Sequence, residues 1–375
     1  MVSIQKIKIM HIIGSLGVGG CENQLLGLFR RINKTRFDTT LLWYSPAEDE
    51  RRRQFKDTDV RMLFLDKFSM PLWKFFFNLR RAIRDIAPDI VHTWMYSANF
   101  WGRWAALTCR VPCLVASYRN EVTEATESSM VPRLSEKFLS SRSCKIANSR
   151  AVALSLNKFY KIPLDDIYII PNAVGFESHD MVAARKSIRR ELGLPEEQKI
   201  VLMVANQRNE KNYPLFIRTA HRVCTNRSDV TFVAVGRTDM AEELSALVHE
   251  YNLNGRVIFT GQRHYIDLWY AGSDIFCLTS KVEGCPNVLL EAMFDSLPVV
   301  STSFTAAHEI IRHTKTGVLV PLDDDKVMAD EIIKLLNDPV RSLEIGTAGE
   351  AFVKQYFSWE NVLSKMESLY MSIAG

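Results

Sequence analysis

The 375-residue sequence has few of the features that assign a chain at once to a class of protein. No apolar run reaches the roughly 18–20 residues of a membrane-spanning helix, and the apolar stretch at 7–13 is too short and interrupted for a signal peptide. Seven cysteines occur without a Cys-x-x-Cys pair, and Cys109 and Cys113 stand four apart with no histidine at zinc-site spacing. These absences predict a protein without a membrane span or zinc site, whose cysteines are reduced thiols in a cytoplasm.

Net charge is also low, at +4, but it is unevenly distributed. Residues 1–190 carry 30 Lys and Arg against 18 Asp and Glu, a balance of +12, whereas residues 191–375 carry 17 against 25, a balance of −8. The basic half predicts an anionic partner, such as membrane headgroups or a phosphate-linked acceptor; an incidental surface bias is the alternative. Nucleic acid is not expected, because the basic residues are scattered and form no recognition-helix signature.

Strand-like and helix-like stretches alternate along the chain. Because 375 residues exceed the size at which one core keeps growing, two domains are expected. Alternation at this spacing predicts an α/β protein with two doubly wound, Rossmann-like domains on parallel sheets. The predicted strands are 6–13, 37–44, 60–65, 89–93, 113–118, 145–148 and 168–171 in the first half, then 199–205, 231–236, 256–261, 274–280, 298–302 and 317–321.

A helix predicted at 71–86 combines large apolar residues with arginines. Trp73 and Phe77 belong to its apolar side, and Arg80, Arg81 and Arg84 lie elsewhere. Packing on a sheet with solvated arginines is the first interpretation of this pattern. Contact with a membrane surface, which the same composition suits, is the second.

Four short motifs follow predicted strands, at 14–22, 117–120, 206–211 and 280–291. Doubly wound sheets bind ligands beyond the carboxyl ends of their strands, so this shared placement indicates binding sites. The glycine-rich first motif lacks the Gly-x-Gly-x-x-Gly spacing, which makes a nicotinamide dinucleotide site a weak interpretation.

The stretch at 283–293 holds two glutamates eight positions apart. Pro286 suits the start of a helix, whose N-terminus offers unpaired N–H donors to a phosphate. Glu291 would lie one turn after Asn287 and could accept two hydrogen bonds from a ribose diol. Glu283 would contact the group that is attached beyond the phosphates. A surface loop entering a surface helix is the alternative.

The loop at 206–211 carries two cations, Arg208 and Lys211, that can converge on one anionic group. A solvated loop would carry such charges too. Next to the stretch at 283–293, however, the pair predicts a site for a nucleotide diphosphate, in which basic side chains rather than a metal ion balance the phosphate charge.

The sequence resembles the GT-B-fold retaining glycosyltransferases of family 4, also called group 1, over essentially its whole length. The run from Glu283 to Met293 is similar to the family's E-x7-E signature, and Gly19-Gly20-Cys21-Glu22 resembles its GGxE turn. Other matching segments are 89–93, 170–174, 316–321 and 357–361. Residues 172–198 hold no strong strand signal and include a basic helical piece at 183–192 that ends at Gly193, so a linker region is predicted at 176–198. The expected domains are an N-terminal acceptor-side domain at 1–175 and a C-terminal nucleotide-sugar-binding domain at 199–357. The resemblance implies a final helix at about 358–375 that crosses back to the first domain.

The resemblance also implies roles for individual residues. Glu283 would contact the transferred sugar, Arg208 and Lys211 would hold the diphosphate, and Arg119 would help to stabilise developing charge. The implied donor-binding residues are Gly19, Gly20, Asn206, Gly236, Gly284, Cys285, Pro286, Asn287, Val288 and Glu291. The sequence departs from the family pattern at three places, with Asn206 for a common arginine, Arg119 for a common histidine, and Thr305-Ala306 for paired glycines.

The implied reaction moves a sugar from a UDP- or GDP-type nucleotide sugar to an acceptor hydroxyl with retention, without cofactor or metal. A retaining glycosidase pair is not expected for Glu283 and Glu291, because eight helical residues would span roughly 12 Å against the roughly 5–5.5 Å required. The expected acceptor is a glycan, lipid-linked or part of a surface polysaccharide or lipopolysaccharide. The expected location is the cytoplasm, with the basic N-terminal domain in peripheral contact with the inner face of the cytoplasmic membrane. The alternatives are an epimerase or hydrolase of the same fold, and a non-catalytic sugar-nucleotide-binding protein.

Overall fold

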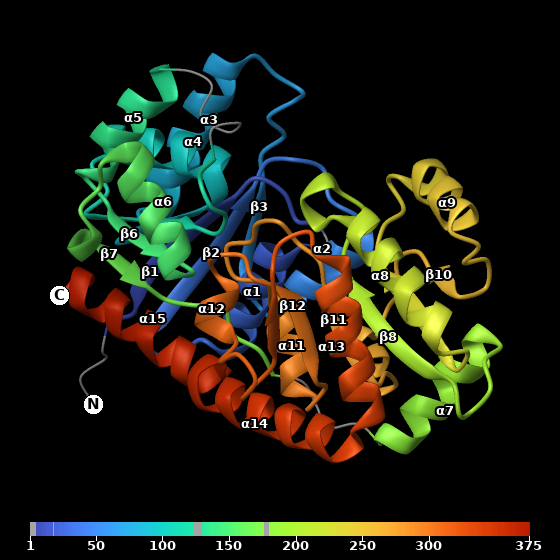
Figure 1. Ribbon diagram of the computed structural model, residues 1–375. Helices are drawn as coiled ribbons and strands as arrows, with labels where there is room; N and C mark the ends of the chain where they lie inside the picture. The colour runs from blue at the N-terminus through green and yellow to red at the C-terminus, as the bar shows by residue number, and fades with distance from the viewer. Residues whose placement is uncertain (1–4, 18, 124–129, 176–179) are drawn as a thin grey trace. The chain divides into compact units, whose positions relative to one another are not determined.

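The computed structural model describes residues 5–17, 19–123, 130–175 and 180–375. The chain divides into two compact units (Figure 1). Unit 1 comprises Met1–Asn172 together with Glu360–Gly375, and unit 2 comprises Ala173–Trp359.

Unit 1 is built on a seven-stranded sheet in the order β3-β2-β1-β4-β5-β6-β7, in which all neighbours are parallel. Parallel sheets are covered by helices on both faces, so their strands are nearly continuous apolar runs. β1 follows this rule, with its last five residues buried. The strands are β1 (Ile7–Ile13), β2 (Phe37–Trp43), β3 (Arg61–Phe64), β4 (Ile90–Trp94), β5 (Cys113–Tyr118), β6 (Cys144–Ala147) and β7 (Ile167–Ile169).

The helices of unit 1 bury apolar side chains in its core. In α3, for example, Phe75, Leu79 and Ile83 recur at helical spacing and enter the core beside Met10 and Ile12 of β1. The helices are α1 (Gly20–Arg31), α2 (Asp49–Lys56), α3 (Leu72–Ile86), α4 (Met95–Thr108), α5 (Met130–Ser140), α6 (Arg150–Tyr160) and α15 (Trp359–Ala374), with a short 3₁₀ helix at Leu164–Asp166.

A buried ion pair joins α4 to α5. Arg103 is fully buried and donates from Nη2 to Glu136 Oε2 at 2.5 Å. The hydroxyl of Tyr118, on β5, donates to the other carboxylate oxygen of Glu136. The Nε of Arg103 donates to the carbonyl of Asn99 at 2.6 Å. This network ties two helices and one strand together inside unit 1.

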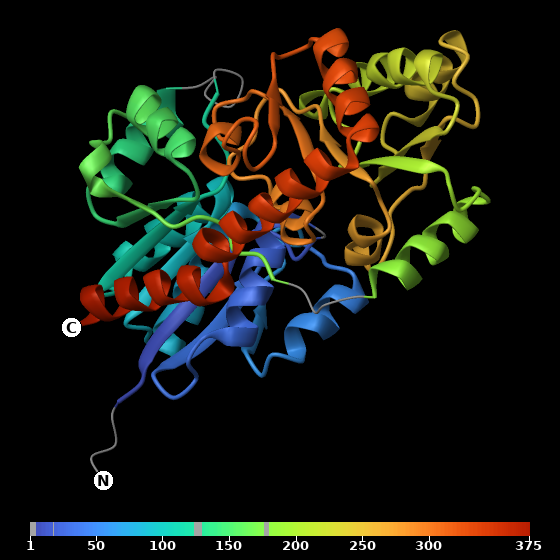
Figure 2. The same ribbon diagram turned by 60° about the horizontal axis from the view of Figure 1, so that its bottom comes forward.

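The final helix, α15, packs beside the strands of unit 1 (Figures 1 and 2). The hydroxyl of Tyr370 lies 2.6 Å from Nδ1 of His92, and the other ring nitrogen of His92 lies 2.7 Å from Ser117 Oγ. Burial lowers the pKa of His92 well below 6.5, so the ring is neutral. Glu367 accepts a hydrogen bond from the backbone of Asn33 at 2.9 Å. The prediction that the last helix returns to the first domain is confirmed.

Unit 2 has a six-stranded parallel sheet in the order β10-β9-β8-β11-β12-β13. Its strands are β8 (Lys199–Val204), β9 (Val230–Val235), β10 (Val257–Phe259), β11 (Ile275–Leu278), β12 (Val299–Thr302) and β13 (Val318–Val320). Its helices are α7 (Met181–Leu192), α8 (Tyr213–Asn226), α9 (Ala241–Glu250), α10 (Ile266–Ala271), α11 (Asn287–Phe294), α12 (Ala307–Ile310), α13 (Asp325–Asn337) and α14 (Pro339–Phe357), with a 3₁₀ helix, η3, at Asn209–Lys211. Two doubly wound parallel sheets confirm the predicted fold class.

The region predicted as a linker, 176–198, contains helix α7, which belongs to unit 2. Arg189 of α7 is 1% exposed and donates to Asp274 Oδ2 at 2.8 Å, and Arg185 donates to Oδ1 of the same carboxylate at 2.8 Å. These ion pairs fix the helix to the sheet, so a linker is the wrong description of 181–192. Residues 176–179 lie outside the described residues.

No helix among the described residues is long and apolar enough to cross a membrane.

Candidate functional site

The predicted donor-site residues of unit 2 follow three adjacent strands, β9, β8 and β11. The strand order reverses at β8, because the chain proceeds to β9 on one side and later returns to β11 on the other. Ligands of doubly wound sheets bind at the carboxyl ends of strands where this reversal occurs. The loops after these three strands therefore lie together at the carboxyl-end edge of the sheet.

Lys211 and Glu283 form an ion pair between the loops after β8 and β11. Their side chains are only 19% and 16% exposed. Ser280 Oγ donates to Glu283 Oε1 at 2.7 Å, and Thr279 Oγ1 donates to the carbonyl of Lys211 at 2.7 Å. Two residues at the end of β11 thus hold both partners of the pair. The cation predicted to hold the diphosphate contacts the carboxylate predicted to contact the sugar.

Arg208 lies in the same loop as Lys211, but its guanidinium is directed elsewhere. Its side chain is 54% exposed, and Nη1 lies 3.8 Å from Glu210 Oε1. An exposed ion pair of this length contributes little to stability, so the guanidinium is free to exchange partners. Convergence of Arg208 and Lys211 on one anion stays a prediction.

Asn206 and Gly236 join the ends of β8 and β9. The side-chain oxygen of Asn206 accepts a hydrogen bond from the backbone N–H of Arg237 at 3.0 Å. Gly236 has φ = 153°, and a Cβ built there would lie 2.0 Å from the carbonyl oxygen of Ala205. Only glycine fits such a close backbone approach. Both residues therefore shape the strand ends, whether or not they contact a ligand.

The turn after Glu283 leads directly into α11. Gly284, Cys285 and Pro286 are buried, whereas Asn287 and Val288 are partly exposed in the first turn of the helix. Pro286 precedes the helix, with φ = −71° and ψ = 109°, as its sequence position predicted. The first-turn N–H groups of α11 point toward the strand-end edge and can bind an anion there.

Glu291 lies on α11 and accepts a hydrogen bond from the hydroxyl of Tyr270, on α10, at 2.8 Å. Burial raises the pKa of Glu291 to about 7, the hydrogen bond from Tyr270 lowers it, and the charges of Asp295 and Asp267 raise it further. The carboxyl group therefore changes its charge near neutral pH.

In unit 1, the GGxE turn follows β1. Gly19 precedes α1 and Gly20 is its first residue. Glu22 accepts a hydrogen bond from Ser15 Oγ at 3.2 Å, and a Cβ at Gly19 would lie 2.5 Å from Glu22 Oε2. Gly20 therefore begins helix α1, and Gly19, which has no Cβ, leaves room for the carboxylate of Glu22. The turn is arranged around this glutamate.

Arg119 follows β5 and is 7% exposed. Its guanidinium carbon lies 4.5 Å from the ring centre of Trp94, and Nη1 donates to Asn172 Oδ1 at 3.0 Å. Burial raises the pKa of Cys21 to about 12, against a smaller opposing effect of the Arg119 charge. The positive charge of Arg119 therefore acts on Cys21 of the GGxE turn. Stacking on an indole fixes an arginine in place at this strand end.

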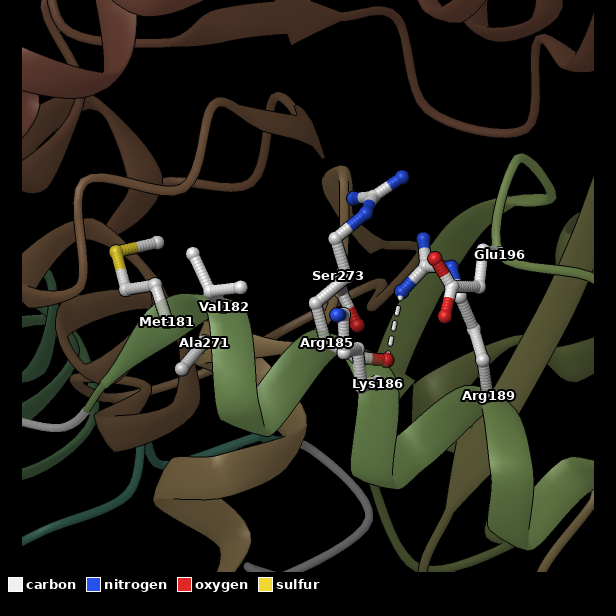
Figure 3. Close-up of a pocket in the computed structure, with 8 residues that line it drawn as sticks. All are labelled: Met181, Val182, Arg185, Lys186, Arg189, Glu196, Ala271 and Ser273. Atoms are coloured by element: carbon white, nitrogen blue, oxygen red, sulfur yellow. Dashed lines mark hydrogen bonds between the residues drawn. The ribbon is translucent and has the colours of Figure 1, made fainter.

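A hollow beside α7 lies at the opposite edge of the unit 2 sheet, near the amino ends of β8 and β11 (Figure 3). Figure 3 shows Arg189 donating to the carbonyl of Arg185, and both side chains also bind Asp274. These arginines are already satisfied by groups of unit 2. The hollow is therefore part of the attachment of α7 and not of the predicted donor site. Its lining residues are Met181, Val182, Arg185, Lys186, Arg189, Glu196, Ala271 and Ser273.

Sequence reasoning missed three residues that position the predicted site. Thr279 and Ser280 directly follow β11 and hold the ion pair, and Tyr270 donates a hydrogen bond to Glu291. A Thr-Ser pair directly before the glutamate loop is a sequence signal that could have been used. Tyr270 gives no such signal, because it comes from a helix 21 positions before Glu291.

Comparison with known proteins defines the class to which this fold and site belong. A model of "Glycosyl transferases group 1" matches residues 184–352, and a model of "Glycosyltransferase Family 4" matches residues 18–177. The chain belongs to the group 1 glycosyltransferases of the GT-B fold. The predicted family and the prediction of a glycosyltransferase are confirmed.

Among curated proteins, the chain is similar to the UDP-Gal:alpha-D-GlcNAc-diphosphoundecaprenol alpha-1,3-galactosyltransferase of Escherichia coli, with 24% identity over 98% of this chain and 97% of that protein. It is also 24% identical to an alpha-1,4-N-acetyl-D-galactosaminyltransferase of Campylobacter jejuni, over 88% of this chain and 89% of that one. Among solved structures, Anabaena Alr3699/HepE in complex with UDP and glucose superposes with a TM-score of 0.86 at 19% identity, over 98% of this chain and 100% of that one. This last likeness shows the fold.

Proposed function

We propose that the protein transfers a sugar with retention of configuration, without a metal ion, from a UDP- or GDP-type nucleotide sugar to a hydroxyl of a lipid-linked or surface-polysaccharide acceptor. The observation that carries the proposal is the Lys211–Glu283 ion pair at the carboxyl edge of the unit 2 sheet, next to the N-terminus of α11. A cation, a helix N-terminus and a carboxylate on one edge match the phosphates, the leaving group and the sugar hydroxyls of such a donor.

The relatives support this class of donor and acceptor. The name of the Escherichia coli relative states a UDP-Gal donor and a diphosphoundecaprenol-linked acceptor, and that of the Campylobacter relative states a PP-undecaprenol acceptor. The Anabaena structure holds UDP and glucose. We therefore assign the nucleotide diphosphate to the edge after β8 and β11, with Glu291 accepting hydrogen bonds from the ribose hydroxyls.

The proposed reaction is a displacement on one face of the sugar. The acceptor oxygen bonds to the anomeric carbon as the bond from that carbon to the diphosphate oxygen breaks, on the same face of the sugar. The acceptor proton passes to the departing phosphate, so no protein base is required. Lys211, Arg208 and the first-turn N–H groups of α11 would stabilise the charge that develops on the diphosphate, and Glu283 would orient the sugar hydroxyls. The role predicted for Arg119, in unit 1, is a second source of positive charge.

A panel assay tests this function. The protein is incubated with UDP- and GDP-sugars, each with and without a lipid-diphosphate-linked glycan, and nucleotide release and glycan mass are measured. We expect nucleotide release with a cognate donor to require the acceptor and to match the mass gained by the glycan. Release of free sugar or an epimer without acceptor would instead favour a hydrolase or epimerase, and binding without turnover would favour a non-catalytic protein.

The protonation of Glu291 should control donor binding near neutral pH. Only an ionised carboxylate accepts both hydrogen bonds of a ribose diol without offering a donor of its own. The Michaelis constant for the donor should therefore fall by about 5–10-fold as pH rises through about 7. In Tyr270→Phe the hydrogen bond that lowers the pKa of Glu291 is lost, so the midpoint should move to higher pH. Tyr265→Phe, an exposed tyrosine at the start of the same helix, should leave the profile unchanged.

The pH dependence of the free energy of unfolding also reports the ionisation of Glu291. Because the pKa of Glu291 is raised above its ordinary 4.5 in the folded protein, its favourable contribution is complete below pH 4.5 and is lost as pH rises through about 7. Glu291→Gln should remove this pH dependence from the free energy of unfolding. An identical pH dependence in Glu291→Gln and wild type would show that another group titrates.

A further inference from the structure

The exposed side of α3 and the segment before it carries bulky apolar side chains. Phe68, Leu72, Trp73 and Phe77 are 72%, 53%, 66% and 53% exposed. Contiguous apolar groups of this size on a surface mark interaction sites rather than ordinary solvated surface. We refer to this surface as the aromatic–basic face and define it by Phe68, Leu72, Trp73, Lys74, Phe77, Arg81 and Arg84.

Helical spacing places these residues on the side of α3 that the core does not use. Trp73 and Phe77 are four residues apart, with ring centres 6.5 Å apart. Arg81 and Arg84 continue the same exposed stripe toward the end of the helix. The opposite side, which includes Phe75 and Leu79, is buried in the core of unit 1. The exposed aromatic rings are therefore presented on a rigid element.

The charge around these rings is positive. Residues 66–86 contain five Lys and Arg against two Asp, and the ion pair of Arg81 with Asp85 is long, at 3.8 Å, and exposed. Aromatic rings beside lysines and arginines suit the boundary between acyl chains and anionic headgroups. A second copy of the chain fits less well, because a symmetric contact would bring the same cations together.

The position of α3 relates this face to the predicted site. α3 follows β3 and lies beside α4, so its aromatic first turn lies at the carboxyl-end edge of the unit 1 sheet (Figure 1). Gly19, Gly20 and Arg119 follow β1 and β5 at that same edge. A surface bound by the first turn of α3 would therefore face the edge at which an acceptor is expected.

We propose that the aromatic–basic face docks unit 1 on an anionic lipid bilayer, with Trp73 and Phe77 inserted among the acyl chains and Arg81 and Arg84 on the headgroups. This docking would bring a lipid-linked acceptor to unit 1, a role that rests on the function proposed above. The docking itself does not, so binding can be tested without substrate.

Flotation or sedimentation with vesicles measures this binding for the full chain. Wild type should bind vesicles of phosphatidylglycerol and phosphatidylcholine at 50 mM salt more tightly than vesicles of phosphatidylcholine alone. Trp73→Ser with Phe77→Ser should lower the binding constant roughly tenfold or more. Arg81→Gln with Arg84→Gln should lower it by ~25-fold on anionic vesicles, at ~5-fold for each arginine, and should leave binding to neutral vesicles unaffected.

Val340→Ser with Leu343→Ser is the matched control, because these α14 side chains are each 68% exposed and apolar. This pair should bind vesicles like wild type, and circular dichroism melting should show all variants folded. Absence of vesicle binding by wild type, or equal loss in the α14 control, would overturn the proposal. A dimer that is lost in the Trp73 and Phe77 variant while vesicle binding is unchanged would also overturn it, and would assign the face to a second copy. Vesicle binding with no transferase activity would instead leave the docking standing and contradict the proposed function.

Discussion

Replacing Lys211 by alanine should lower turnover by roughly 10²–10³-fold, the usual effect of removing one preorganised group that stabilises leaving-group charge. In the proposed site the Lys211 ammonium group would balance phosphate charge and would also hold the Glu283 carboxylate, with which it forms an ion pair. Steady-state kinetics with a cognate donor and acceptor give the measurement. Lys211→Arg should recover only part of the loss, because a planar fork does not match the point charge of an ammonium group.

Stability should change far less than activity in Lys211→Ala. Ser280 still donates to Glu283, so we expect a loss of no more than about 1–2 kcal/mol in the free energy of unfolding. Lys334→Ala is the control, because this exposed lysine lies at the end of α13, away from the carboxyl edge of the sheet, and forms an ion pair with Glu331 on its own helix. Turnover of Lys211→Ala within about threefold of wild type would remove Lys211 from the proposed site.

Glu136→Ala should destabilise unit 1 by about 3–5 kcal/mol, the cost of leaving a buried charge without its partner. Arg103 is fully buried and Tyr118 would lose its acceptor, so neither group gains water in exchange. In a unit of this size the melting temperature should fall by roughly 6–20 °C, as measured by calorimetry or circular dichroism.

A double variant separates the buried charge from simple loss of packing. Arg103→Met with Glu136→Met removes both charges and keeps most of the volume, so it should be less destabilised than Glu136→Ala. Glu331→Ala, which removes a mostly exposed ion pair, should change stability by less than about 1 kcal/mol. A double variant that is less stable than Glu136→Ala would show that the network contributes through geometry rather than charge.

The fold could be predicted from the sequence because parallel strands leave an unusually clear pattern. β1 and β9 are buried on both faces and therefore appear as apolar runs, and the predicted strand at 113–118 coincides with β5. Shorter strands were predicted too long. β10 ends at Phe259 and not at Gly261, although the N–H of Thr260 still donates to the carbonyl of Ala234 and the carbonyl of Gly261 accepts from the N–H of Gly236. α7 was taken for a linker because its attachment depends on Asp274, some 90 positions away in sequence.

The predicted site was only partly accessible from sequence. Spacing alone indicated that Lys211 and Glu283 follow neighbouring strands, and they form an ion pair. Spacing could not show that Arg208 would be directed to Glu210, because an exposed side chain chooses among several partners of similar energy. Nor could it show the contact of Tyr270 with Glu291, which lowers the pKa of the carboxyl group against the larger effect of burial and depends on how α10 packs against α11.

The return of α15 to unit 1 has a consequence for how the chain folds during synthesis. His92 is hydrogen-bonded to the hydroxyl of Tyr370, and the backbone of Asn33 donates to the carboxylate of Glu367. Both partners lie on α15, whereas the rest of unit 1 ends at Asn172. At 5–20 residues per second, a ribosome needs roughly 10–40 s to make the intervening residues. During that interval unit 1 exposes the groove that α15 later fills, while all of unit 2 is being made. Nascent unit 1 should therefore bind chaperones until the last helix emerges, and unit 2 should be the first to reach its native state.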